Sequence, residues 1–309
     1  MNGESAKIEI IKPFERSFGL MKQVLFQPFD LKKWFVIGFA AWLANLGSGN
    51  YNFNPNRQDW KDTPYLQDFN EWLGQIPHGL LLGGIAAFIA LLLAVGVVFA
   101  WLRARGKFIF IDCIAKNRAA IGAPWRQFRE QGNSYFLFSL LVAVVLGVIL
   151  IATALPFALP LIRHGRFAHE NVYLICAIIA WAFLLIVVVF AWTILAHFMV
   201  VIMYRRHCRA REGLRAAISL ISSYPGEIAL YCFFWIVIAI GAGVVSCITI
   251  LATCCIALLP YLGTVILLPV YVCLRGFGLL FIAQFGPEFD VWAASSDTAG
   301  ASLPPPLPG

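Results

Sequence analysis

The sequence predicts an all-α fold: a polytopic membrane helix bundle of six transmembrane helices, preceded by an interfacial amphipathic helix. Composition is the first observation behind this prediction. Of the 309 residues, 61% are hydrophobic and 13% are charged, and the mean hydropathy is +0.80. Soluble domains carry about 25% charged residues, so lipid must cover the apolar excess. The second observation is residues 171–204, a run of 34 residues without Asp, Glu, Lys or Arg, whereas about 20 apolar residues cross a bilayer core.

The N-terminal residues 1–30 are predicted to form a cytoplasmic or interfacial amphipathic segment. A helix is expected over residues 10–27, because its apolar residues recur at helical spacing while charged residues occupy its other faces. These apolar residues are Phe14, Phe18, Met21 and Leu25. The helix is expected either along the cytoplasmic membrane interface or against the protein's own cytoplasmic loops. The segment has no apolar signal-peptide core, so the first span is expected to act as an uncleaved signal.

Residues 31–287 are predicted to form a six-span membrane domain. The spans are expected near residues 31–47, 79–102, 134–162, 171–204, 228–256 and 264–286. The last two share one charge-free stretch, residues 228–274, which is too long for a single crossing and is divided by a predicted turn at Pro260–Gly263. A short surface helix carrying Trp72 is expected between the first two spans. Residues 288–309 are predicted to form a flexible, Pro-rich cytoplasmic tail.

Two basic segments are predicted to form cytoplasmic elbows. The first follows the second span and carries a short helix opened by Pro124. The second follows the fourth span and carries a short amphipathic helix with Leu214, Ile218 and Ile221. A shift of 94 residues places Gly132 on Gly226, which suggests two related units of long helix, elbow and returning helix.

The distribution of basic residues predicts the orientation. Of the 23 Lys and Arg residues, 18 lie before the first predicted span or in the loops after the second and fourth spans, and 4 lie on the opposite side. Because basic residues collect in cytoplasmic loops, both termini are predicted to be cytoplasmic in a multi-pass protein of the bacterial inner membrane. The same rule explains the net charge of +7, so no nucleic-acid partner is expected.

Three polar residues within apolar surroundings are candidate ligand or structural sites: Arg275, His197 and Asp112. Arg275 is the one formal charge well inside a predicted span, where it indicates either anion or headgroup binding in a polar cavity or a structural pairing. His197 is interpreted as an interhelical hydrogen-bonding group, with a proton-transfer or ligand role as the alternative. Asp112, the acid of a basic elbow, is expected to pair with a neighbouring Arg.

The sequence predicts neither a catalytic site nor a cofactor. It contains no G-x-S-x-G, H-E-x-x-H or P-loop motif, so the protein is expected not to be an enzyme. The eight cysteines form no C-x-x-C pair and most lie in apolar runs. They are interpreted as small apolar helix residues, not as metal ligands or disulfides.

Three stretches carry a family resemblance: GKFIFIDCIAKNRAAIGAPWRQFREQGNSYFLF, MYRRHCRAREGLRA and CCIALLPYLGTVILLPVYVCLRGFGLLFIAQFGPEFDVW. They resemble a bacterial family of multi-pass membrane proteins of unknown function, and the resemblance covers most of residues 14–292. More distantly, the layout is similar to the membrane domain attached to some bacterial glycerophosphodiester phosphodiesterases. The 309 residues contain no counterpart of the soluble catalytic domain of those enzymes, so the resemblance implies no catalytic residues here.

Two classes of function remain open from the sequence, with a third less favoured. The first is a non-enzymatic accessory, scaffold or envelope-homeostasis module that contacts the lipid bilayer and has a membrane-protein partner or a second copy of itself. The alternative is a small transporter or lipid-handling protein built around a polar cavity at Arg275. A membrane enzyme would require acids or His residues to converge in space.

Overall fold

A computed structural model describes residues 8–46, 77–164, 172–253 and 259–293, and the described part of the chain is helical without strands. The helices are α1 (Ile11–Phe26), α2 (Leu31–Ala44), α4 (His78–Ala115), α5 (Gly122–Gln127), α6 (Arg129–His164), α7 (Val172–Arg206), α8 (Ala210–Ser223), α9 (Pro225–Ala252), α10 (Pro260–Ile266) and α11 (Leu268–Ala283). The predicted surface helix around Trp72 and the tail beyond residue 293 lie outside the described residues.

Four of these helices are long and apolar enough to cross a membrane: α4, α6, α7 and α9. The 38 residues of α4 extend about 57 Å at a rise of about 1.5 Å per residue, which exceeds a bilayer core of about 30 Å. The predicted first span corresponds to α2, which has only 14 residues. The predicted sixth span is interrupted at Leu267 between α10 and α11, where Pro269 lies in the first turn of α11. Six spanning helices are therefore not confirmed.

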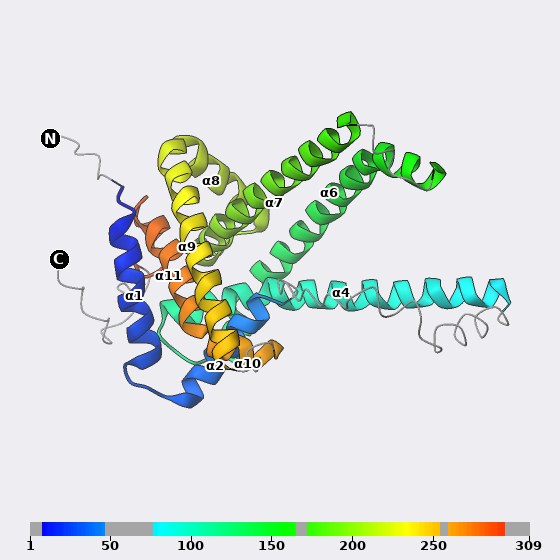
Figure 1. Ribbon diagram of the computed structural model, residues 1–309. Helices are drawn as coiled ribbons and strands as arrows, with labels where there is room; N and C mark the ends of the chain where they lie inside the picture. The colour runs from blue at the N-terminus through cyan, green and yellow to red at the C-terminus, as the bar shows by residue number, and fades with distance from the viewer. Residues whose placement is uncertain (1–7, 47–76, 165–171, 254–258, 294–309) are drawn as a thin grey trace.

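A packed base forms one end of the molecule. It consists of α1, α2, α8, α10 and α11, together with residues 104–115 of α4 and 194–206 of α7 (Figure 1). Helix α2 lies against α4 at Gly106, where an added Cβ atom would come within 2.6 Å of the backbone of Leu43 and Ala44. Only glycine permits this approach, so the residue type at position 106 sets how closely the two helices pack.

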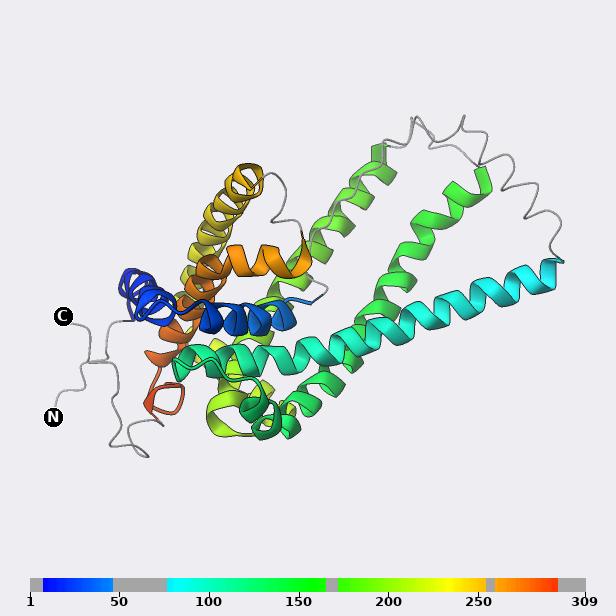
Figure 2. The same cartoon turned by 90° about the horizontal axis from the view of Figure 1, so that it is seen from below.

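The outer halves of the long helices leave this base, and α4 diverges from α7, whereas α6 and α7 stay in contact through a hydrogen bond from Trp181 Nε1 to Thr153 Oγ1 (3.0 Å). Residues 80–99 of α4, 137–155 of α6 and 179–189 of α7 expose many large apolar side chains, such as Leu80, Phe88 and Phe183. Figures 1 and 2 show α4 running away from the outer end of α7 in both views. These halves lack the protein neighbours that bury apolar side chains in a soluble protein, which agrees with a lipid surrounding.

The two ends of the membrane domain are joined at the base. The Glu9 backbone N–H donates to Gln284 Oε1 (2.9 Å), and Gln284 Nε2 donates to the Glu9 carbonyl (2.8 Å). Helix α1 continues along α11, with Ser17 Oγ 3.3 Å from Cys273 Sγ. A helix, α1, thus occupies the predicted range 10–27 and packs on α11, while its amphipathic character is not confirmed. Its location at a membrane interface stays a prediction.

Two units with the same order of elements follow α2. Each has a long helix, a short helix and a returning long helix: α4–α5–α6 and α7–α8–α9. Both first helices are followed by a residue with positive φ, Asn117 (48°) and His207 (50°), a common way to end a helix.

At the second elbow, burial together with the nearby Lys116 and Arg205 lowers the pKa of His207, while its ring stacks on Phe128.

Candidate functional site

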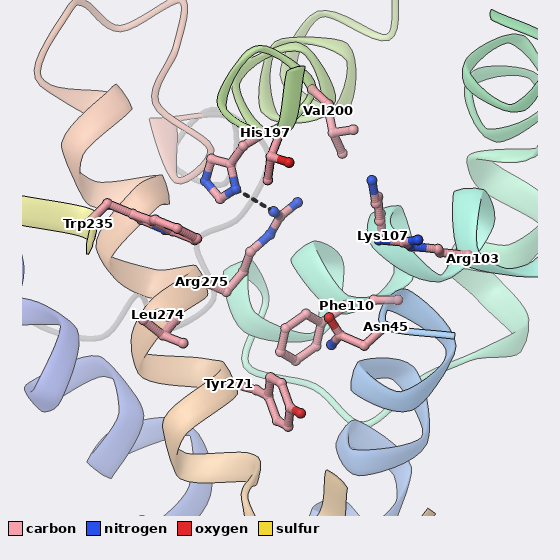
Figure 3. Close-up of a pocket in the computed structure, with 13 residues that line it drawn as sticks. Asn45, Arg103, Lys107, Phe110, His197, Val200, Trp235, Tyr271, Leu274 and Arg275 are labelled. Carbon is pink, nitrogen blue, oxygen red and sulfur yellow. Dashed lines mark hydrogen bonds between the residues drawn. The ribbon is translucent and has the colours of Figure 1, made fainter. Parts of the chain in front are cut away.

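A pocket with apolar walls and several cationic side chains lies where the outer halves of the helices meet the packed base. Its volume is about 240 Å³, and it is lined by residues of α4, α7, α9 and α11 and by Asn45 at the end of α2. Figure 3 shows Arg275 entering from α11, with Arg103 and Lys107 on α4 across the pocket. Three cationic side chains therefore share one cavity, and among the described residues that line it none is acidic.

Arg275 is held at only one of its nitrogen atoms. Its Nη1 donates to His197 Nδ1 on α7 at 2.8 Å (Figure 3). Nε and Nη2 are shielded from solvent and have no hydrogen-bond partner within the described residues. Since a guanidinium has five N–H donors, most of its hydrogen-bonding capacity is unused, and a buried unpaired donor is unfavourable.

The tautomer of His197 follows from its contact with Arg275, and the position of its ring depends on a glycine, Gly278, on α11. Arg275 has no acceptor, so His197 Nδ1 must accept, which makes the ring neutral with its proton on Nε2. A Cβ atom added at Gly278 of α11 would collide with His197 Nε2. The absence of a side chain at position 278 therefore gives the imidazole room to face Arg275.

The two cations of α4 differ in how they are held. Lys107 Nζ donates to Tyr135 Oη on α6 at 2.7 Å and lies 4.8 Å from the centre of that ring. An ammonium has three donors, so this bond leaves capacity for a further acceptor. Arg103 Nε is buried without a hydrogen-bond partner among the described residues. Both positions face the pocket with unused donors.

Arg105 and Arg206 of the base have protein partners, whereas Arg205 Nε, like Arg103 Nε of the pocket, is buried without a hydrogen-bond partner among the described residues. The Arg105 guanidinium lies over the rings of both Trp101 (4.4 Å) and Trp125 (4.8 Å). Its Nη2 also donates to Asn133 Oδ1 at 2.9 Å. Arg206 pairs with Glu288 at 2.7 Å. Such contacts stabilise a buried or half-buried cation, and these residues have no need of a ligand.

Asp112, the third residue singled out from the sequence, does not line the pocket. It is fully buried and forms ion pairs with Lys116 (2.7 Å) and Arg118 (2.7 Å). Tyr204 Oη of α7 donates to its Oδ1 at 3.0 Å. Asp112 thus joins the inner ends of α4 and α7, and its neighbourhood is that of a structural group.

The structure brings together two of the three predicted residues, Arg275 and His197, and adds two that sequence reasoning missed. Arg103 and Lys107 are two of the basic residues that follow the second predicted span, where the rule for cytoplasmic loops is enough to account for them. Their spacing of four residues, which places both on one helix face, was the available signal. No group of three or more His, Cys, Asp or Glu side chains with the geometry of a metal site occurs in the described ranges.

The fold and the pocket define a helical protein of the membrane class with a cationic cavity at the edge of its packed base. A family of unknown function (DUF7544) matches residues 9–291, and the chain belongs to that family. No curated protein and no solved structure matches the chain. The likeness to the membrane domain of glycerophosphodiester phosphodiesterases finds no support in these comparisons and stays a prediction.

Proposed function

We propose that this protein is a non-enzymatic lipid-handling membrane protein that binds an anionic ligand in the pocket of Arg275. The observation that carries the proposal is the convergence of Arg275, Arg103 and Lys107 on one cavity with unused donors. Cations gathered in a cleft with low-dielectric walls concentrate anions there. An Arg that faces a cavity within a membrane helix bundle commonly marks a ligand or ion pathway.

The proposal places this protein in the second of the two classes left open by the sequence. A polar cavity that reaches Arg275 was the feature expected to separate a lipid-handling protein from a sealed scaffold. The half-buried state of Arg275, His197 and Lys107 supports the cavity, because each side chain is surrounded by protein yet still has accessible surface.

Thiol labelling tests whether the pocket is reached from water. Ala196→Cys places a thiol on the pocket wall, and Ala40→Cys places one in the core of the base, where Ala40 is fully buried. Both are made in a background with the eight native cysteines replaced. We expect a membrane-impermeant maleimide to label Ala196→Cys and to leave Ala40→Cys unlabelled. Equal protection of both thiols, in protein that inserts normally, would reject an open pocket.

A scaffold or accessory role is a second candidate, supported by the exposed outer half of α4. Residues 80–99 of that helix have apolar side chains without protein neighbours in the described structure. In a bilayer this face is covered either by lipid or by another membrane helix. Cross-linking of Leu91→Cys protein within native membranes distinguishes the two: a cross-linked dimer or a partner adduct favours the scaffold, and a monomer favours lipid.

A further inference from the structure

We propose that the pocket is a site for a phosphomonoester headgroup, in which the terminal phosphate of an anionic lipid lies between Arg275 of α11 and Arg103 and Lys107 of α4. The inference rests on the proposed function and adds the chemical class of the ligand and its source. The three side chains come from helices on opposite sides of the cavity. An anion between them would supply acceptors to Arg275 Nε, Arg275 Nη2 and Arg103 Nε, which have none among the described residues, and to the remaining N–H donors of Lys107.

The charge of the site favours a phosphomonoester over a phosphodiester. Arg103, Lys107 and Arg275 present three positive charges, and within the described residues no salt bridge joins any of them to a carboxylate. A phosphomonoester carries about −1.5 to −2 charges near neutral pH and offers three strong acceptor oxygens. A phosphodiester carries a single negative charge, so it would leave two of the three cations uncompensated.

The geometry of Arg275, in addition to its charge, suits a phosphate ligand. With Nη1 held by His197, the guanidinium plane is fixed while Nε and Nη2, which are shielded from solvent, have no acceptor among the described residues. These two nitrogens form one edge of the planar group, and such an edge binds two oxygens of a phosphate at once. His197 therefore acts as a positioning residue that orients Arg275 for a two-point contact.

The position of the pocket indicates a lipid as the source of the phosphate. Along α4, the exposed apolar stretch ends at Phe99, and Arg103 follows one turn later at the pocket. Trp235 of α9 lines the same cavity, and its neighbours Phe233 and Ile236 are exposed. A headgroup in the pocket would thus leave its acyl chains beside apolar helix surface. The volume of about 240 Å³ suits a headgroup, because sites for whole drug-sized ligands measure about 300–1,000 Å³.

Calorimetric titration of the full-length protein in zwitterionic micelles tests the inference. Phosphatidic acid supplies the phosphomonoester, phosphatidylglycerol the diester, and glycerol 3-phosphate the same phosphate without acyl chains. We expect phosphatidic acid to bind at least about tenfold more tightly than the other two. Arg275→Gln should raise its Kd by about tenfold or more, and Arg275→Lys, which keeps the charge without the fork, by less.

Arg211→Gln is the matched control, since Arg211 is an exposed cation of α8 outside the pocket. It should leave the Kd within about twofold of wild type, since an exposed charge contributes little. If Arg275→Gln does not fold, Arg103→Gln and Lys107→Gln should each show the same loss.

Three results would overturn the inference. The protein could bind phosphatidylglycerol as tightly as phosphatidic acid, or glycerol 3-phosphate as tightly as phosphatidic acid. Alternatively, Arg211→Gln could lose as much affinity for phosphatidic acid as the pocket variants do. Each of these results can occur with Ala196→Cys labelled, which leaves the proposed function standing. Protection of Ala196→Cys would reject that function itself.

Discussion

Asp112 is one of the buried residues that join α4 and α7. Its buried carboxylate accepts from Tyr204 and pairs with Lys116 and Arg118. We predict that Asp112→Asn lowers the free energy of unfolding by about 2 kcal/mol, because hydrogen bonds to a charged group contribute about 1.5–3 kcal/mol. Denaturation with sodium dodecyl sulfate in mixed micelles measures the change. Glu15→Gln, at an exposed position of α1, is the control, and equal unfolding of both variants would contradict a structural role for Asp112.

At the same scale, only part of the pocket follows from the sequence. Arg275 stands out because a charge within an apolar helix is rare. Arg103 and Lys107 do not stand out, because basic residues at the end of a span have an ordinary explanation in membrane topology. Their convergence with Arg275 depends on how α4 crosses α11, and no pattern within either helix encodes that crossing.

At the scale of the helix, two glycines of α4 distinguish the effect of close helix packing on stability from the effect of intrinsic helix propensity. A Cβ atom at Gly106 would meet the backbone of α2, whereas one at Gly96 would meet nothing within 4 Å. Gly106→Ala is predicted to lower the free energy of unfolding by about 1–3 kcal/mol, because backbone atoms must shift to make room. Gly96→Ala should lie within about 1 kcal/mol of wild type, on the stabilising side. The same denaturation assay measures both, and equal effects would refute close packing at position 106.

The helices also differ in how well an apolar sequence predicts whether lipid or protein covers them. Charge-free runs overlap α4, α6, α7 and α9, since such long runs have few alternatives to a span, but α4 continues to Ala115, well beyond the predicted end at residue 102. The same reasoning is not confirmed for the first predicted span, because α2 has only 14 residues. Its apolar residues Ile37, Ala40 and Ala41 are covered by protein, and a short apolar run has the same composition whether protein or lipid covers it.

For the whole molecule, the contact between Glu9 and Gln284 bears on topology. These residues lie next to the start of α1 and the end of α11 and share two hydrogen bonds, so we expect the two ends of the membrane domain on one side of the membrane. We predict that alkaline phosphatase fused after Gly309 is inactive, while a fluorescent protein that folds only in the cytoplasm is bright there. Phosphatase fused to α1 should be inactive too, and activity at either end would contradict cytoplasmic termini.

The first half of α4 is exposed and the second half is enclosed by protein, so the two halves should tolerate different amino-acid substitutions. Side chains at positions 80–99 contact few other residues, so Leu, Ile, Val and Phe are interchangeable there as long as the segment stays apolar. Residues 104–115 are enclosed, with Phe108, Ile109 and Ile111 at most 1% exposed, and each must fit a particular space. Two different constraints therefore act on the sequence of one continuous helix. Residues 80–99 need only stay apolar, whereas the side chains of residues 104–115 must also have the right shape.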